Sequence, residues 1–122
     1  MIDEPANFDW SKAEEFCGYM VQNPDNLGNV HDITELAAKL KEKQIVVTII
    51  ADILSLTITK PPGEMGADIA VGSVQRFGVP MANGGPHPGY MACKDDFKRK
   101  MPGRLIGVSK DSHGDKAYRM SL

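Results

Sequence analysis

The polar side chains best suited to chemistry gather in a stretch rich in glycine and proline. They are Gln75, Arg76, Asn83 and His87. The loop from 78 to 89 holds four glycines and three prolines in twelve residues, and such a loop can bring its backbone close to a ligand. It matches neither the P-loop nor the GxGxxG pattern. Gln75 and Asn83 are suited to satisfying the loop's own backbone groups.

Arg76 and His87 are the two side chains in this stretch that are best suited to bind a ligand or take part in a reaction. A guanidinium that follows a buried strand needs a ligand anion or an ion pair, and the sequence offers Asp52 or Asp68 as a carboxylate partner. An imidazole between two prolines suits acid–base chemistry or a ligand contact. Because no second His or Cys stands close to His87, we expect no metal site.

A helix and a strand upstream would position this loop. Apolar residues recur at helical spacing from 33 to 40 behind Asp32 as N-cap, which predicts an amphipathic helix over 32–43. The β-branched run at 45–50 is typical of a strand covered on both faces. With the apolar run at 17–21, these elements predict a βαβ unit and a parallel sheet. Asp52 follows the strand, either at a ligand site or as the cap of a short helix over 53–60.

Two further strands enclose the loop itself. They are predicted at 67–72 and 89–93, the second returning beside the first. A short basic helix at 94–100 follows, and then a hairpin with strands at 104–108 and 117–120. His113 lies in the polar turn of that hairpin and is interpreted as a solvated turn residue.

Length and composition limit what the chain can be. Its 122 residues suit one domain, which we expect to be partial: a lead-in at 1–16, an α/β core at 17–94, and a basic helix and hairpin at 95–122. The net charge of -2 combines an acidic first third with a basic stretch near residue 100. That stretch lacks interleaved aromatics, so nucleic-acid binding is not expected.

The remaining composition indicates neither a membrane span nor a disulfide. The longest apolar run, 45–58, is too short to span a bilayer. Cys17 and Cys93 form no CxxC pair, and buried, reduced thiols are the simplest interpretation.

Three long motifs resemble the glycine dehydrogenase (decarboxylating) family, the P-protein of the glycine cleavage system. They read PPGEMGADIAVGSVQRFGVP, GGPHPGYMACKDDFKRKMPGRLIGVSKD and YRMSL. The resemblance implies an α/β fold: part of the large domain of pyridoxal phosphate (PLP) enzymes of the aspartate-aminotransferase type, with a mostly parallel sheet and an antiparallel return strand. It also implies PLP-dependent glycine decarboxylation, with transfer of the aminomethyl group to the lipoylated H-protein.

The resemblance further implies which half of the enzyme this is. P-proteins contain two related halves or subunits, and the half that binds PLP has a His-Lys pair whose lysine forms the Schiff base. This sequence has Gln75-Arg76 at that place. A guanidinium cannot form an imine, so the resemblance is to the N-terminal half, with no catalytic residue of its own and PLP bound by the other half. Asp52 stands where active PLP folds pair a carboxylate with the pyridine nitrogen. The resemblance makes Asp52, Gln75, Arg76 and His87 relic or pocket-lining candidates.

The chain also departs from the family. The family usually reads GYGGPHA where this chain has Ala82-Asn83-Gly84-Gly85-Pro86-His87-Pro88. The family's sequence before GYMVQNPD and its QTREQHIRR-type segment after Leu122 are not present, so we expect a fragment that exposes apolar sheet and strand edges.

The expected partners follow from the resemblance. They are the remainder of the P-protein or a PLP-bearing subunit, the lipoylated H-protein and glycine, in a homo- or hetero-oligomer located in the mitochondrial matrix or the bacterial cytoplasm. The alternative is a noncatalytic binding module that kept the fold and lost the cofactor chemistry.

Overall fold

The amphipathic segment after Asp32 forms the α-helix of the molecule, α1 (Thr34–Glu42), in a computed structural model that describes residues 9–121. Ala37 and Leu40 lie on its buried face and are fully buried. The helix begins slightly later than expected, with Ile33 at the N-cap position. The Asp32 carboxylate still accepts a hydrogen bond from the Thr34 N–H at 2.9 Å, so it caps the first turn from one residue earlier.

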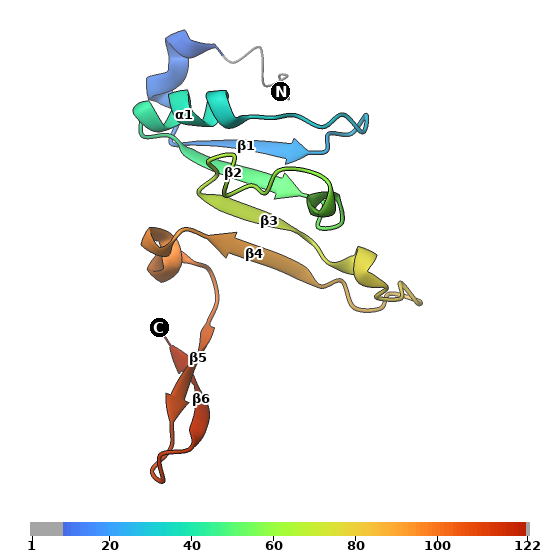
Figure 1. Ribbon diagram of the computed structural model, residues 1–122, viewed down its shortest axis with the longest axis vertical. Helices are drawn as coiled ribbons and strands as arrows, with labels where there is room; N and C mark the ends of the chain where they lie inside the picture. Colours follow the sequence, from blue (N-terminus) through green and yellow to red (C-terminus); the bar gives the residue numbers. More distant parts are fainter. Residues whose placement is uncertain (1–8, 122) are drawn as a thin grey trace.

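Four strands form the main sheet in the order β1-β2-β3-β4 (Figure 1). They are β1 (Gly18–Asn23), β2 (Val46–Ala51), β3 (Ile69–Ser73) and β4 (Gly89–Cys93). The β1–β2 and β2–β3 pairs are parallel, and β4 returns antiparallel to β3. The predicted α/β class, with a mostly parallel sheet and an antiparallel return strand, is confirmed.

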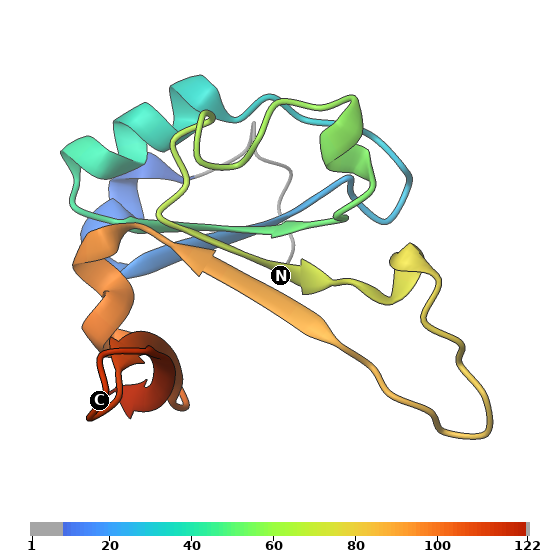
Figure 2. The ribbon, with the colours of Figure 1, turned by 60° about the horizontal axis from the view of Figure 1, so that its bottom comes forward.

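The hydrophobic core lies between α1 and one face of this sheet. Figure 2 shows α1 and the segment after β2 on the same side of the strands. The β2 side chains on that side are all buried, because they face the helix. The core consists of Ala13, Ile33, Ala37, Leu40, Ile45, Val47, Ile49, Ala51, Met65 and Ala67.

The face of the sheet opposite α1 is less completely covered (Figure 2). On that face of β2, Thr48 is buried and Val46 and Ile50 are half-buried, so the expectation that β2 is covered on both faces is met only in part. The register places Ile50, Val71 and Met91 in one row across that face. Ile50 and Val71 are half-buried, and Met91 is 37% exposed. The expected exposure of apolar sheet is confirmed here.

The remaining helical segments in the described chain are short stretches of 3-10 helix, three or six residues long. They lie at Trp10–Glu15, Ser55–Thr57, Gln75–Phe77 and Asp95–Lys100. The short helices predicted around 53–60 and 94–100 are therefore present as tighter 3-10 turns. Among residues 9–121, no helix has the length and apolar character needed to cross a membrane.

A separate two-stranded sheet follows, built from β5 (Leu105–Lys110) and β6 (Lys116–Ser121). His113 lies exposed in its turn, where its N–H donates to the Asp111 carboxylate at 2.8 Å, so its interpretation as a turn residue is confirmed. Both cysteines are free thiols, but Cys17 is exposed and Cys93 only half-buried, which corrects the expectation that they are buried.

Candidate functional site

The candidate site lies at the edge where the three parallel strands reach their carboxyl ends. β1 ends at Asn23, Asp52 follows β2, and β3 ends at Ser73, immediately before the Gln75–Phe77 turn. The Asp52 N–H donates to the Asn23 carbonyl at 3.3 Å, which ties the first two strand ends together. Ligands in open α/β sheets bind at this edge, so the predicted residues are in a suitable place.

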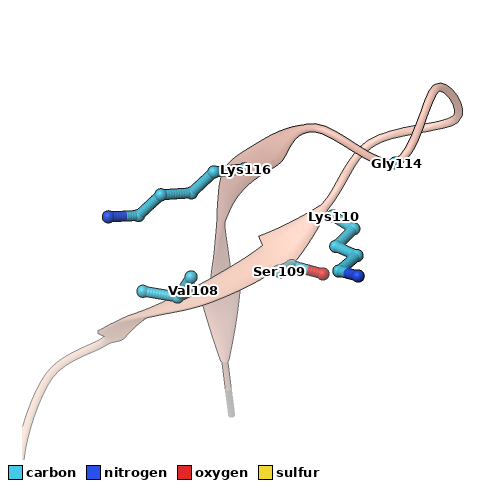
Figure 3. A pocket seen from close by; sticks show the side chains of 5 residues that line it. All are labelled: Val108, Ser109, Lys110, Gly114 and Lys116. Carbon is cyan, nitrogen blue, oxygen red and sulfur yellow. The ribbon is translucent and has the colours of Figure 1, made fainter.

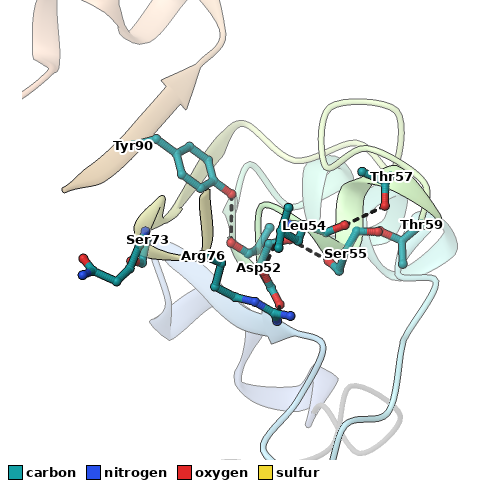
Figure 4. A network of polar contacts seen from close by, with 10 residues as sticks. Asp52, Leu54, Ser55, Thr57, Thr59, Ser73, Arg76 and Tyr90 are labelled. Atoms are coloured by element: carbon teal, nitrogen blue, oxygen red, sulfur yellow. Dashed lines mark hydrogen bonds and ion pairs between the residues drawn. The ribbon is translucent and has the colours of Figure 1, made fainter. Parts of the chain in front are cut away.

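Asp52 takes the capping role, one of the two that the sequence left open, and it also forms an ion pair. One carboxylate oxygen accepts from the Leu54 N–H at 3.1 Å and so caps the turn that follows. The other oxygen pairs with the Arg76 guanidinium (Figure 4). The Asp52 side chain is only 25% exposed, and capping and pairing together satisfy both of its oxygens.

Arg76 takes Asp52 and not Asp68 as its partner because the two carboxylates lie at opposite ends of the sheet. Asp68 precedes β3, where it accepts from Lys94 Nζ at 2.8 Å and from the Val47 N–H at 2.9 Å. Arg76 follows β3 and its side chain remains 63% exposed. Its predicted need for a carboxylate is confirmed, although most of the side chain faces solvent.

Tyr90 is a member of this network that sequence reasoning missed. Its hydroxyl donates to the Ala51 carbonyl at 2.9 Å, so the ring crosses β3 to reach β2 (Figure 4). Burial raises the pKa of Tyr90, and the nearby negative charge of Asp52 raises it further. Gly72 makes the crossing possible, because a Cβ at that position would lie 2.6 Å from the Tyr90 ring. The only sequence signal was a glycine near the end of a β-branched strand.

Gln75 secures the start of the loop, as expected. Its Nε2 donates to the Val79 carbonyl at 2.8 Å, and its backbone N–H donates to Ser73 Oγ at 3.1 Å. Gln75 therefore stabilises the loop backbone through its side-chain amide group. Its side-chain oxygen is a buried acceptor that has no hydrogen bond among the described residues.

His87 and Asn83 are not brought into the network. Both are exposed, and within residues 9–121 neither makes a hydrogen bond. Ala82 has a positive φ of 43°. That backbone conformation suits glycine better than alanine. The structure therefore separates the loop's tip from the Asp52–Arg76 pair.

A second polar cluster fixes the segment after β1. The Asn23 side chain donates to the His31 carbonyl at 2.8 Å and accepts from the His31 N–H at 3.1 Å. The Asp25 carboxylate accepts from His31 Nε2 at 2.9 Å and from the Leu27 and Asn29 N–H groups. These donors, His31 first, lower the pKa of Asp25 below its ordinary value of 3.8.

We expect Asp25 to make the protein sensitive to acid. Its pKa is lower in the folded chain than in the unfolded chain, so its contribution to stability is present above pH 3.8 and is lost as the pH falls below that value. In Asp25→Asn, the fall of unfolding free energy between about pH 4 and 2 should be shallower. Denaturant unfolding at several pH values measures this. Glu64→Gln, an exposed carboxylate outside the cluster, should leave the slope unchanged, and equal slopes in wild type and Asp25→Asn would contradict the assignment.

The chemistry available at this edge is limited. None of its hydrogen bonds or ion pairs in the described chain involves a lysine, and its one carboxylate is paired with Arg76. Within the same residues, no group of three or more His, Cys, Asp or Glu side chains could hold a metal ion. The network therefore presents a partly exposed guanidinium beside a neutralised carboxylate, and among the described residues no lysine amine is bonded to either group.

The chain is similar to known proteins in both sequence and fold. The sequence profile of the family described as glycine cleavage system P-protein matches residues 1–122. Glycine dehydrogenase (decarboxylating) of Rhizobium etli (strain CIAT 652) is 59% identical over 105 residues, which are 86% of this chain and 11% of that protein. The enzyme of the same name from Roseobacter denitrificans (strain ATCC 33942 / OCh 114) is 54% identical over 117 residues, 96% of this chain and 12% of that protein.

A solved structure gives the same result for the fold. The chain is similar to the crystal structure of glycine decarboxylase (P-protein) of the glycine cleavage system in inhibitor-bound form, with a TM-score of 0.83 and 42% identity. The match covers 89% of this chain and 25% of that chain. The chain spans 11% to 12% of the length of these curated relatives, which are much longer proteins.

Proposed function

Because the chain belongs to the glycine cleavage system P-protein family, we propose that it forms part of the large α/β domain of a glycine dehydrogenase (decarboxylating). The complete enzyme would decarboxylate glycine with PLP and pass the aminomethyl group to the lipoylated H-protein. This chain would supply scaffold from the half that does not carry the Schiff-base lysine. Its partners would be the rest of the P-protein or a PLP-bearing subunit, in a homo- or hetero-oligomer of the bacterial cytoplasm or the mitochondrial matrix.

The Asp52–Arg76 ion pair is the observation that carries this proposal. A guanidinium stays protonated and cannot form an imine, so Arg76 cannot take the role of a Schiff-base lysine. Asp52 is occupied by Arg76 and by the Leu54 N–H, so its carboxylate is not available to a pyridine nitrogen. The residues of this edge therefore do not fit PLP as a covalently held cofactor.

The open face of the sheet supports a structural role within a larger domain. Parallel sheets in α/β proteins carry helices on both faces. Here α1 covers one face, while the row of Ile50, Val71 and Met91 on the other is only partly buried. Further layers of a complete P-protein would cover that row.

A labelling experiment tests the absence of cofactor chemistry. The purified chain is incubated with PLP, reduced with borohydride and analysed by peptide mass spectrometry. We expect low, scattered labelling of exposed lysines, because no lysine lies in the network at the strand ends. Arg76→Lys, with Arg99→Lys as a matched control outside the site, tests whether an amine at position 76 is enough. Stoichiometric labelling of one lysine in the wild-type chain would overturn the proposal.

A complementation experiment separates this function from the alternative, a noncatalytic binding module. The remaining segments of a P-protein are supplied as separate chains, and glycine–bicarbonate exchange is measured with and without the 122-residue chain. Exchange that depends on the added chain supports the enzyme component. Unchanged exchange, with the chain folded and present in excess, favours the binding module.

A further inference from the structure

Two lysines meet at the edge of the sheet opposite to the Asp52–Arg76 pair. Lys41 belongs to the last turn of α1, and Lys94 directly follows β4. Both reach the edge where β2 and β3 begin, because β4 runs antiparallel to β3 (Figure 2). The Lys41 amine lies within hydrogen-bond reach of the Lys94 amine. The fold therefore brings together two groups that ordinarily carry the same charge in water.

One largely buried carboxylate lies beside this lysine pair, and Lys94 takes it. Lys94 Nζ lies 2.8 Å from Asp68 Oδ1, while Asp68 Oδ2 accepts from the Val47 N–H at 2.9 Å. The Asp68 side chain is only 12% exposed, and these two contacts use both of its oxygens. Within residues 9–121, no carboxylate lies within ion-pair distance of Lys41. Lys41 therefore stands beside a cation without an anion of its own.

The contact between the two amines decides which of them loses its proton first. An ammonium donates hydrogen bonds and accepts none, so a hydrogen bond between two lysines needs one neutral amine. Lys94 stays the ammonium, because Asp68 and then Lys41 raise its pKa, with Asp96 adding to the effect. The hydrogen bond from Lys94, partial burial and the charge of Lys94 lower the pKa of Lys41, against an opposing effect of Asp68. Lys41 is therefore the acceptor and the nucleophile of the pair.

The Lys41 amine is both positioned and reachable. A Cβ on Gly66 would lie 3.5 Å from Lys41 Nζ and 3.2 Å from Ala37 Cβ, so the lysine side chain lies against the turn before β3. Lys41 is nevertheless exposed to solvent. A neutral amine that is open to solvent can attack a small electrophile. The adjacent Lys94 ammonium would stabilise the negative charge that develops on that electrophile.

We propose that Lys41 is an acylation site, whose amine takes an acyl group from a small activated donor, an acyl phosphate or an acyl thioester. The Nζ lone pair attacks the acyl carbon, a C–N bond forms, and the C–O bond to phosphate or the C–S bond to the thiol group breaks. The leaving group departs with the electron pair, and the nitrogen loses one proton to solvent. The product amide is neutral, so it removes the like-charge contact with Lys94.

This proposal is independent of the proposed function, because Lys41 and Arg76 lie at opposite edges of the sheet. An imine forms reversibly, whereas an amide accumulates. The PLP experiment would therefore show at most partial labelling of Lys41, and its outcome at the strand ends does not depend on acylation.

Other lysines of the chain provide internal references. Lys43, the C-cap residue of α1, is exposed, and within residues 9–121 it forms no ion pair. Lys110 and Lys116 are paired directly across the β5–β6 hairpin, yet Figure 3 shows their side chains projecting in different directions. Lys116 Nζ instead lies 5.5 Å from the centroid of the Tyr118 ring. Lys110 therefore tests whether a neighbouring lysine is enough when the two amines do not meet.

Chemical acetylation of the 122-residue chain tests the site. The chain is treated with acetyl phosphate, and in a parallel arm with acetyl-CoA, and the occupancy of each lysine is followed over time by peptide mass spectrometry. We expect Lys41 to react at least about threefold faster than Lys43 and Lys110. The donor that gives the larger preference identifies the chemical class. The preference should shrink as the pH rises, because the other lysines then also lose their protons, whereas a preference due to exposure alone would stay constant.

Substitutions at position 94 test the role of the neighbouring charge. Lys94→Gln removes that charge, so Lys41 should then react at the rate of Lys43, whereas Lys94→Arg keeps a cation and should retain the preference. Lys98→Gln is the matched control, because Lys98 pairs with Asp95 at 2.6 Å. The pH series on the wild-type chain needs no variant, so the test holds even if Lys94→Gln folds poorly. Equal rates for the three lysines with both donors, a preference that does not change with pH, or a Lys41 rate unaffected by Lys94→Gln in a folded chain would overturn the proposal.

Discussion

Gly72→Ala is expected to cost about 3 kcal/mol or more of unfolding free energy, because the added methyl group has no room. A Cβ at this position would lie 2.2 Å from the Ala51 carbonyl oxygen and 2.6 Å from the Tyr90 ring. The ring could move only by giving up its 2.9 Å hydrogen bond to the same carbonyl. Thermal unfolding followed by circular dichroism should show a melting temperature lower by about 10 °C.

Gly63→Ala is the matched control for this substitution. A Cβ at Gly63 would have no neighbour within 4 Å, so the same added methyl group should change stability by less than about 0.5 kcal/mol. If both variants melt at the wild-type temperature, the close approach of β2, β3 and Tyr90 described here is wrong.

Leu40→Ala should have a similarly large effect for the opposite reason, since it leaves a cavity. Leu40 is fully buried between α1 and the sheet. Removing a buried leucine side chain typically costs about 2–5 kcal/mol, from the lost apolar burial together with the unfilled space. Denaturant unfolding should show a lower midpoint with an unchanged dependence on denaturant.

Leu27→Ala makes the same chemical change at an exposed position. Leu27 is 79% exposed, so its truncation should alter stability by less than about 0.5 kcal/mol. A Leu40→Ala variant as stable as Leu27→Ala would mean that α1 does not pack on the sheet as described.

The elements of the core were predictable because each has a local signal. The β-branched run at 45–50 became β2, and the apolar repeat behind Asp32 became α1. The short runs flanking the Gly-rich loop became β3 and β4, in antiparallel register. The short helices were less predictable, since three or six residues carry too little periodicity to separate a 3-10 helix from an α-helix.

The candidate site was predictable in its members but not in its geometry. Asp52, Arg76 and Gln75 were identified from residue type and position, yet the choice between Asp52 and Asp68 needed the strand directions. Tyr90 was missed because its partner, Ala51, lies on a strand that is not its neighbour in the sheet. His87 looked chemically promising in the sequence but lies exposed, outside the network.

The sequence by itself determined the fold class and the family, and it identified Gln75-Arg76 as the polar pair after a buried strand, because these depend on periodicity and on residue identity at a motif. Only the tertiary structure decided what Arg76 does there. The parallel strands bring Asp52 to the same edge, and the ion pair neutralises the carboxylate that a cofactor ring would need. It also showed a sheet face that is only partly covered, because exposure depends on which surfaces meet in space. Residue types alone do not specify which surfaces meet.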